Sequence, residues 1–239
     1  MRKRSPAEVK RLVATHPVKS RDTFPTSAHH IHDYLRLVSA LGGNPEPLQP
    51  ELRVGPNEIS AFRNKWKLQK ATSKIIGVNP GAEYGPAKRW PVDRFVEVLE
   101  SLAKTHRPTV LIFGGNADRQ LASRIESAFT DKRTTILNLA GRTSLRELIA
   151  GISICDLLLT NDTGPMHLAA AVQTSVIVPF GSTSPELTGP GMPGASGDYL
   201  LLGQAPCAPC FLRECPIDFR CMKSIESRDV IKAASAALA

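Results

Sequence analysis

The chain has 239 residues, of which 42% are hydrophobic and 22% are charged, a balance that is typical of a globular protein with one large or two small domains. No run of about 18 apolar residues occurs, so we expect no membrane-spanning helix. The N-terminus also lacks the apolar stretch of a secretory signal peptide.

Positive charge is concentrated at the N-terminus. Residues 1–22 hold seven Lys or Arg against two acidic residues, a surplus of five within the net charge of +8. A basic segment of this kind can bind nucleic acid or anionic lipid. We favour the simpler interpretation, a solvated and partly disordered terminus. No aromatic interleaving, zinc-finger spacing or RNA-binding motif accompanies it, so no nucleic-acid partner is expected.

Two helices and a proline-rich linker are predicted ahead of residue 73. Residues 28–41 repeat apolar side chains at i, i+3, i+4 and i+7, the spacing of one helix face. Residues 44–56 carry four prolines and predict an extended linker. Residues 57–69 predict a second helix, with Asn57 as a candidate cap.

Three histidines, His29, His30 and His32, crowd the start of the first predicted helix. A metal site needs ligands that converge on one point, whereas neighbouring side chains on a helix point in different directions. We therefore expect these histidines to be surface residues.

From residue 73 onward, strand and helix patterns alternate. This alternation predicts an α/β fold with a parallel sheet and helices on both faces. Strands are predicted at residues 74–79, 109–113, 135–139, 157–159, 175–180 and 199–202. Helices are predicted from Pro91 and at residues 117–129, 144–151, 166–172 and 227–238.

A polar turn at residues 160–165 lies between a predicted strand and a predicted helix. The first backbone N–H groups of such a helix lack intrahelical partners and attract phosphate, and Thr163 and Gly164 occupy their positions. Asp162 can reach a ligand or cap the helix, and His167 follows one turn later on the same side. The simpler alternative is an ordinary N-cap and a structural histidine.

The loop after the first predicted strand should open on the same edge of the sheet. Gly81 and Gly85 allow tight backbone paths near a ligand. Lys88 and Arg89 can supply positive charge to a diphosphate, although Lys88 could also be solvated and Trp90 simply buried. Two such loops on one edge favour a nucleotide-diphosphate site more than either does alone.

Four of the five cysteines, Cys207, Cys210, Cys215 and Cys221, fall within fifteen residues. A tetrathiolate zinc site is one interpretation, but only one pair has the two-residue spacing of a zinc knuckle. We favour free thiols or a local structural role, and we expect Cys155 to be buried.

Three blocks in the second part of the chain resemble the ADP-heptose glycosyltransferases, glycosyltransferase family 9. They are VNPGAEYGPAKRWPVDRF, LTNDTGPMHLAAAV and PFGSTSPELTGP, and the first is closest to the heptosyltransferase II branch. The resemblance implies the C-terminal half of a GT-B glycosyltransferase: a Rossmann-like nucleotide-sugar-binding domain at residues 73–239, preceded by a basic helical and linker segment at residues 1–72.

The family resemblance also implies roles for individual residues. Lys88 would contact the donor diphosphate and assist the leaving group. Asp162, Thr163 and Gly164 would line the diphosphate and sugar, with His167 beside them. Asp118 would lie near the ribose. Lys88 and Asp162 are the expected catalytic residues, and neither a metal nor a cofactor is expected.

The activity implied is inverting, metal-independent transfer of heptose from ADP-heptose to the lipopolysaccharide inner core. The location implied is the cytoplasm, with peripheral contact with the inner face of the inner membrane as a further expectation. Residues 1–72 show no β–α alternation, so the family's N-terminal domain, with its general base and acceptor surface, is expected to be missing or on a separate chain. Two alternatives are a donor-binding half without independent activity and a related transferase that uses another nucleotide sugar.

Overall fold

The computed structural model describes residues 29–69, 73–131, 133–192 and 198–239. The basic arm at residues 1–22 therefore lies outside the described residues. Within them, no helix is both long enough and apolar enough to cross a membrane.

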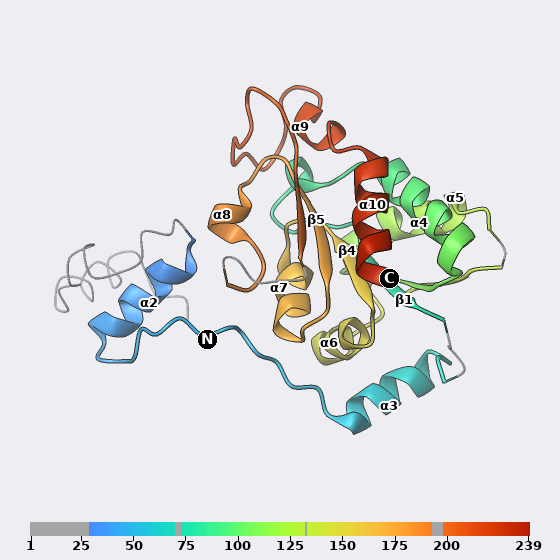
Figure 1. The fold of residues 1–239 in the computed structure, drawn as a ribbon, viewed down its shortest axis with the longest axis horizontal. Coiled ribbons are helices and arrows are strands. Elements are labelled where there is room, and N and C mark those ends of the chain that lie inside the picture. Colours follow the sequence, from blue (N-terminus) through green and yellow to red (C-terminus); the bar gives the residue numbers. More distant parts are fainter. Residues whose placement is uncertain (1–28, 70–72, 132, 193–197) are drawn as a thin grey trace.

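Six parallel strands form one sheet in the order β3-β2-β1-β4-β5-β6 (Figure 1). This is the strand order of a Rossmann-like sheet. The α/β fold expected from the sequence is confirmed, with every predicted strand present. The strands are β1 (Ile75–Asn79), β2 (Thr109–Ile112), β3 (Thr135–Asn138), β4 (Leu157–Thr160), β5 (Val176–Phe180) and β6 (Tyr199–Leu202).

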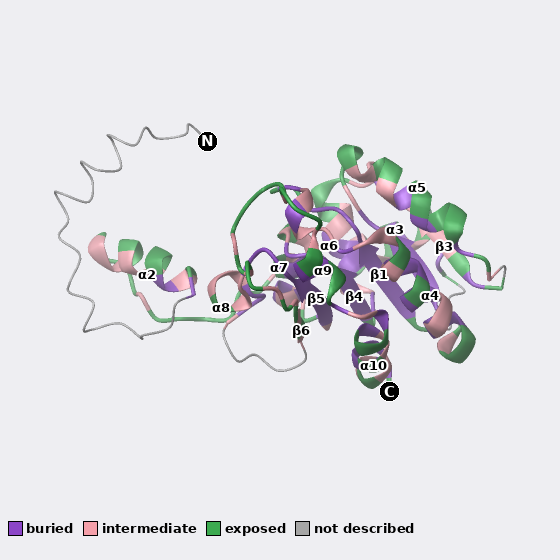
Figure 2. Cartoon of the chain, turned by 90° about the horizontal axis from the view of Figure 1, so that it is seen from above, coloured by how far each residue is buried: buried purple, intermediate pink, exposed green. Residues whose placement is uncertain are grey.

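Successive strand residues alternate between two hydrophobic clusters, one on each face of the sheet. In β4, Leu157 and Leu159 belong to one cluster and Leu158 belongs to the other. Figure 2 shows the strands buried between helices whose outer faces are exposed. Because both faces of each strand are covered, the central strands appear in the sequence as continuous apolar runs rather than as alternating ones.

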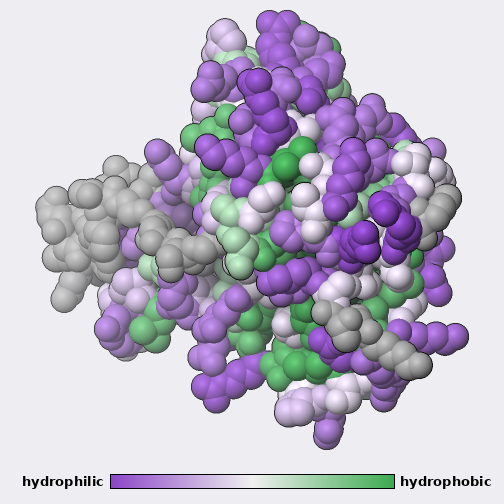
Figure 3. Space-filling view, turned by 45° about the vertical axis from the view of Figure 1, so that its right-hand side comes forward, coloured by the Kyte–Doolittle hydropathy of each residue, from purple (hydrophilic) through white to green (hydrophobic). Residues whose placement is uncertain are grey.

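Helices cover both faces. The first cluster lies under α4 (Val92–His106), α5 (Arg119–Ala128) and α10 (Ser227–Leu238), and the second lies under α3 (Pro56–Lys65), α6 (Leu145–Ser153) and α7 (Gly164–Ala171). Short helices at η2 (Pro86–Lys88), η3 (Asn116–Asp118), α8 (Pro185–Thr188) and α9 (Arg220–Lys223) lie in the connections. The surface in Figure 3 is largely hydrophilic, with small apolar areas between the charged side chains.

Helix α3 packs against the domain instead of presenting a bare apolar face. Phe62 is 2% exposed, and a Cβ on Gly151 of α6 would clash with its ring. The cap differs from the expected one: the helix begins at Pro56, and Glu58 accepts the backbone N–H of Gly55 at 2.9 Å. Asn57 is therefore inside the helix, because proline is favoured in the first turn.

Helix α2 (Ile31–Ala40) stands off one side of the domain next to α8 (Figure 1). Its first turn is anchored there, because His30 donates its backbone N–H to the carbonyl of Leu187 at 3.0 Å. Farther along the helix, Tyr34 is 67% exposed and Leu41, just beyond its end, is 66% exposed. This part of the apolar stripe is uncovered by the described residues.

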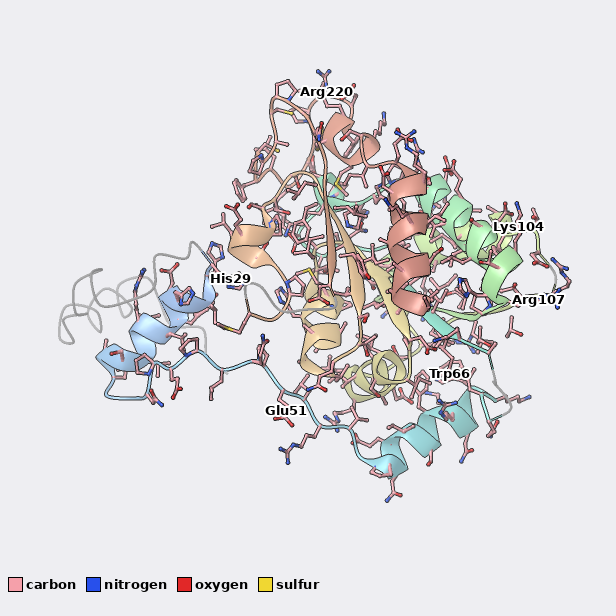
Figure 4. All side chains as sticks on the ribbon, in the orientation of Figure 1. His29, Glu51, Trp66, Lys104, Arg107 and Arg220 are labelled. Carbon is pink, nitrogen blue, oxygen red and sulfur yellow. The ribbon has the colours of Figure 1, made fainter. Side chains whose placement is uncertain are left out.

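The expectation that all three histidines lie on the surface is wrong for two of them, because His29 and His32 are buried and only His30 is exposed. His29 lies at the end of α2 that faces α8 (Figure 4). Its Nδ1 accepts the backbone N–H of Ile31 at 3.2 Å, so the ring proton is assigned to Nε2, which donates to the carbonyl of Gly189 at 3.2 Å. Anchoring by α8 is a tertiary contact that local spacing does not reveal.

Candidate functional site

The candidate site lies at the carboxyl ends of β1 and β4. These neighbouring strands pair through Asn79 and Thr160, their last residues. Consecutive connections run from β1 toward β2 on one side and from β4 toward β5 on the other, so the sheet has its topological switch point here. The two loops singled out from the sequence leave the sheet at this point.

Lys88 and Asp162 form an ion pair across the two loops. The Lys88 Nζ lies 2.7 Å from Asp162 Oδ2, and the side chains are only 12% and 4% exposed. The alternative of a solvated Lys88 is therefore excluded. The pair places a positive charge at the switch point and fixes its position.

Two hydroxyl groups complete the surroundings of Asp162. Thr183 donates to Oδ2 at 2.7 Å, and Thr188 donates to the same atom at a longer distance of 3.4 Å. Both residues follow β5, so three separate loops meet at one carboxylate oxygen. No described residue donates to Oδ1, so this oxygen is free to accept a hydrogen bond from a ligand.

Helix α7 begins without a side-chain cap. Thr163 is its N-cap residue, but neither the Thr163 hydroxyl nor the Asp162 carboxylate bonds to the first turn. The alternative of an ordinary side-chain N-cap is therefore wrong. The backbone N–H of Gly164, at the first helical position, forms no hydrogen bond with a described residue. An uncapped helix N-terminus offers hydrogen-bond donors and a partial positive charge to an anion.

Asn161 joins the two principal loops and was not singled out from the sequence. It is fully buried, donates to the carbonyl of Pro80 at 2.8 Å and accepts the backbone N–H of Trp90 at 3.0 Å. Trp90 is itself 1% exposed and donates its indole N–H to Ile225, so it is a core residue. A buried amide that satisfies groups from another loop holds the backbone on both sides of Lys88.

A cavity of about 290 Å³ opens beside this ion pair at the same edge of the sheet. It brings together four of the residues expected from the sequence: Gly81, Asp118, Thr163 and Gly164. Its other lining residues are Asn79, Ala82, Glu83, Gly114, Gly115, Thr143, Ser144, Leu145, Leu148 and Pro165. The mixture of apolar walls, glycine backbone and a carboxylate suits a small polar ligand such as a nucleoside.

Asp118 has a structural partner inside this cavity. Its Oδ2 accepts the backbone N–H of Gly115 at 2.9 Å, while no described residue donates to Oδ1. Gly81 passes so close that a Cβ there would overlap the carboxylate, whereas a Cβ on Gly164 would meet no protein atom within 4 Å. An alanine at position 81 would therefore force the Asp118 carboxylate to move, whereas no residue outside the helix itself opposes one at position 164.

His167 is exposed on α7 near the ion pair. Loss of hydration on one side lowers the pKa of this imidazole. The Asp162 carboxylate acts in the opposite direction, and the neighbouring His29 and Lys88 add to the lowering. The imidazole is therefore mainly neutral at pH 7. His167 does not line the 290 Å³ cavity, so its place is at the margin of the site.

A larger hollow of about 560 Å³ lies beside the edge strand β3. Trp66, Arg119 and Arg142 line it, and none of the residues expected from the sequence does. We favour the smaller cavity as the ligand site because it adjoins the switch point, the uncapped helix and the buried ion pair.

The cysteines carry no disulfide. Among the described residues, no three His, Cys, Asp or Glu side chains are grouped so that they could hold a metal ion. Cys155 is buried as expected, and burial raises the pKa of its thiol. Cys215 differs, because the backbone N–H groups of residues 217, 219 and 218 lower its thiol pKa.

Comparison with known proteins connects this geometry to a family. The family model of glycosyltransferase family 9 (heptosyltransferase) matches residues 9–219. Lipooligosaccharide heptosyltransferase 2 of Campylobacter jejuni is 35% identical over 175 residues, which cover 72% of this chain and 53% of that protein. Lipopolysaccharide heptosyltransferase 2 of Escherichia coli K12 is 37% identical over 148 residues, which cover 61% and 42%.

A solved structure supports the same family assignment. The Escherichia coli ADP-heptose lipopolysaccharide heptosyltransferase II has a TM-score of 0.71 and 27% identity, with 85% of this chain and 61% of that chain covered. This chain spans about half the length of the relatives that it matches. Since the family model covers most of its length, the chain belongs to glycosyltransferase family 9 (heptosyltransferase).

Proposed function

We propose that this chain binds ADP-heptose and takes part in the transfer of heptose to the inner core of lipopolysaccharide. The observation that carries the proposal is the Lys88–Asp162 ion pair beside the uncapped N-terminus of α7. The relatives named above are heptosyltransferases, and the solved one is an ADP-heptose lipopolysaccharide heptosyltransferase. Residues 73–239 would form the donor-binding domain, and residues 1–72 the segment that precedes it.

The donor would lie across the carboxyl ends of the strands. Adenosine would occupy the 290 Å³ cavity, with the free Oδ1 of Asp118 accepting from a ribose hydroxyl. The diphosphate would face the backbone N–H groups at Thr163 and Gly164 and the Lys88 ammonium. Asp162 would hold Lys88 through Oδ2 and offer Oδ1 to a sugar hydroxyl, while His167 would border the sugar.

The chemistry that follows is inverting and needs no metal. An acceptor hydroxyl attacks the anomeric carbon while a general base removes its proton, and the bond from that carbon to the diphosphate oxygen breaks. Negative charge then develops on ADP, where the fixed ammonium of Lys88 and the helix N–H donors stabilise it. We propose that a second domain, on a separate chain or in a further part of the protein, supplies the base and the acceptor surface.

The setting that suits this function is the cytoplasm, at the inner face of the inner membrane. The basic residues 1–22 would favour peripheral contact with anionic headgroups. A donor-binding half without independent activity remains the second candidate, because the described residues contain a single Rossmann-like sheet. A related transferase with another nucleotide sugar is the third.

Two measurements on the purified chain test the proposal. Titration calorimetry with ADP and ADP-heptose measures donor binding, and mass spectrometry of a heptosyl-Kdo acceptor after incubation with ADP-heptose measures transfer. Binding together with transfer supports the enzyme, whereas binding without transfer supports the donor-binding half. If ADP does not bind but another nucleotide binds tightly, the ADP-heptose proposal is wrong.

A further inference from the structure

The segment at residues 211–213, in the connection between β6 and α9, lies against two loops of the candidate site. Phe211 accepts a hydrogen bond from the Tyr84 hydroxyl at 3.0 Å and donates its backbone N–H to Ser182 at 2.7 Å. Arg213 accepts the backbone N–H of Ala87 at 3.0 Å. The segment therefore connects the loop that carries Lys88 to the loop that carries Thr183.

The contact with the Lys88 loop is close. A Cβ on Gly85 would overlap the carbonyl group of Arg213, so only glycine permits this approach. Gly85 and Ala87 are both buried. The backbone of Arg213 is thereby fixed next to η2, the short helix that ends in Lys88.

Tyr84 brings two cations together. The Lys88 Nζ lies 5.0 Å from the centroid of the Tyr84 ring, and the Arg213 Cζ lies 5.5 Å from the same centroid. Both distances are within the range of a cation–π contact. The two charges are therefore separated by no more than roughly one Debye length, about 10 Å at 0.1 M salt.

These two cations differ in their partners. Lys88 is paired with Asp162, whereas Arg213 forms no ion pair with a described residue and its side chain is exposed. The guanidinium of Arg213 is therefore available to a ligand, beside the charge of Lys88 that Asp162 already pairs. A diphosphate would supply the missing negative charge, and the planar fork of a guanidinium suits phosphate oxygens.

We propose that Arg213 is a second phosphate-binding residue of the donor site, held beside Lys88 by the Tyr84 ring and by the backbone contacts of residues 211–213. This inference rests on the proposed binding of an ADP-linked donor. It assigns a ligand contact to the loop that follows β6, an edge strand of the same sheet, whereas the rest of the site is formed by the loops after β1, β2, β4 and β5.

Calorimetric titration of Arg213→Gln with ADP, and separately with adenosine, tests the proposal against the wild-type chain. We expect ADP to bind about fivefold more weakly, since an exposed charged hydrogen bond is lost, and adenosine to bind as in the wild type. Arg213→Lys should recover part of the ADP affinity. Arg228→Gln, on the outer surface of α10, makes the same change in net charge and should leave both affinities unchanged.

Tyr84→Phe and Tyr84→Leu separate the ring from the hydroxyl. The phenylalanine variant keeps the cation–π surface and should bind ADP more tightly than the leucine variant. Unchanged ADP affinity in Arg213→Gln, or an equal loss for ADP and adenosine, would overturn the role of Arg213 while leaving the proposed function intact. Failure of the wild-type chain to bind ADP would overturn both.

Discussion

The Lys88–Asp162 pair makes a prediction about stability as well as about binding. We expect the loss of either residue to destabilise the fold, because the two side chains are only 12% and 4% exposed. Removing one member of a buried ion pair leaves the other charge without compensation, which costs more than the pair itself contributes.

Asp162→Asn and Lys88→Met keep the side-chain sizes close to the original. In Asp162→Asn the Lys88 ammonium loses its anion, and we expect a loss of about 3 kcal/mol in the free energy of unfolding. In Lys88→Met the carboxylate keeps the hydroxyl donors of Thr183 and Thr188, so the loss should be nearer to about 2 kcal/mol. For a chain of this size, 3 kcal/mol corresponds to a fall in Tm of roughly 6–12 °C.

A double-mutant cycle measures the pair directly. Urea denaturation of the wild type, both single variants and the double variant gives the four free energies of unfolding. The double variant should be less destabilised than the sum of the single variants by about 2 kcal/mol, because neither charge is left unpaired. Additive losses within about 0.5 kcal/mol would refute the buried ion pair.

Three further predictions concern other parts of the site and the cysteines. Gly164→Ala should keep the wild-type Tm, because its Cβ meets no atom outside its own helix, yet it should weaken ADP binding about tenfold. Gly81→Ala should lower the Tm, because its Cβ overlaps the Asp118 carboxylate. Normal ADP affinity in Gly164→Ala would remove the N-terminus of α7 from the site. The pKa of His167 should lie below its ordinary value of about 6.5 in the free protein, so its neutral form favours folding at neutral pH and that contribution is lost as the pH falls. Calorimetry in two buffers near pH 6 measures the net proton exchange on ADP binding, to which the terminal phosphate of ADP contributes equally in both proteins. His167→Gln should shift this exchange by the share of the histidine, and an identical exchange in the variant would contradict the assignment. Thiol labelling should modify Cys215 early and Cys155 only after unfolding, and early reaction of Cys155 would contradict this account. Elemental analysis should find no stoichiometric zinc, and one zinc per chain would contradict the assignment of the cysteines as free thiols.

The fold could be predicted because its strands are buried on both faces. Runs such as Leu157, Leu158 and Leu159 occur only where each side of the strand has a helical cover, and turns with glycine and proline separate them. The proximity of Lys88 and Asp162 could also be predicted, because parallel strands end at one edge of the sheet. The distance of 2.7 Å between them follows from tertiary packing, which spacing does not encode.

Other parts of the site could not be predicted because they depend on contacts between distant segments. Thr183 and Thr188 follow a different strand, and nothing in their local pattern indicates that they donate to Asp162. In the sequence, Asn161 looks like an ordinary polar turn residue. Only the structure shows that its amide oxygen accepts the Trp90 N–H and that its amide nitrogen donates to the Pro80 carbonyl. His29 was expected at the surface because the α8 contact that buries it comes from a segment about 160 residues away.

The most direct test of the donor site is a crystal structure of the chain with ADP. The adenosine should fill the cavity that contains Asp118, and phosphate oxygens should lie within hydrogen-bond distance, about 2.7–3.2 Å, of the Gly164 backbone N–H and the Lys88 Nζ. Nucleotide bound elsewhere, such as in the hollow lined by Trp66 and Arg142, would contradict the central claim.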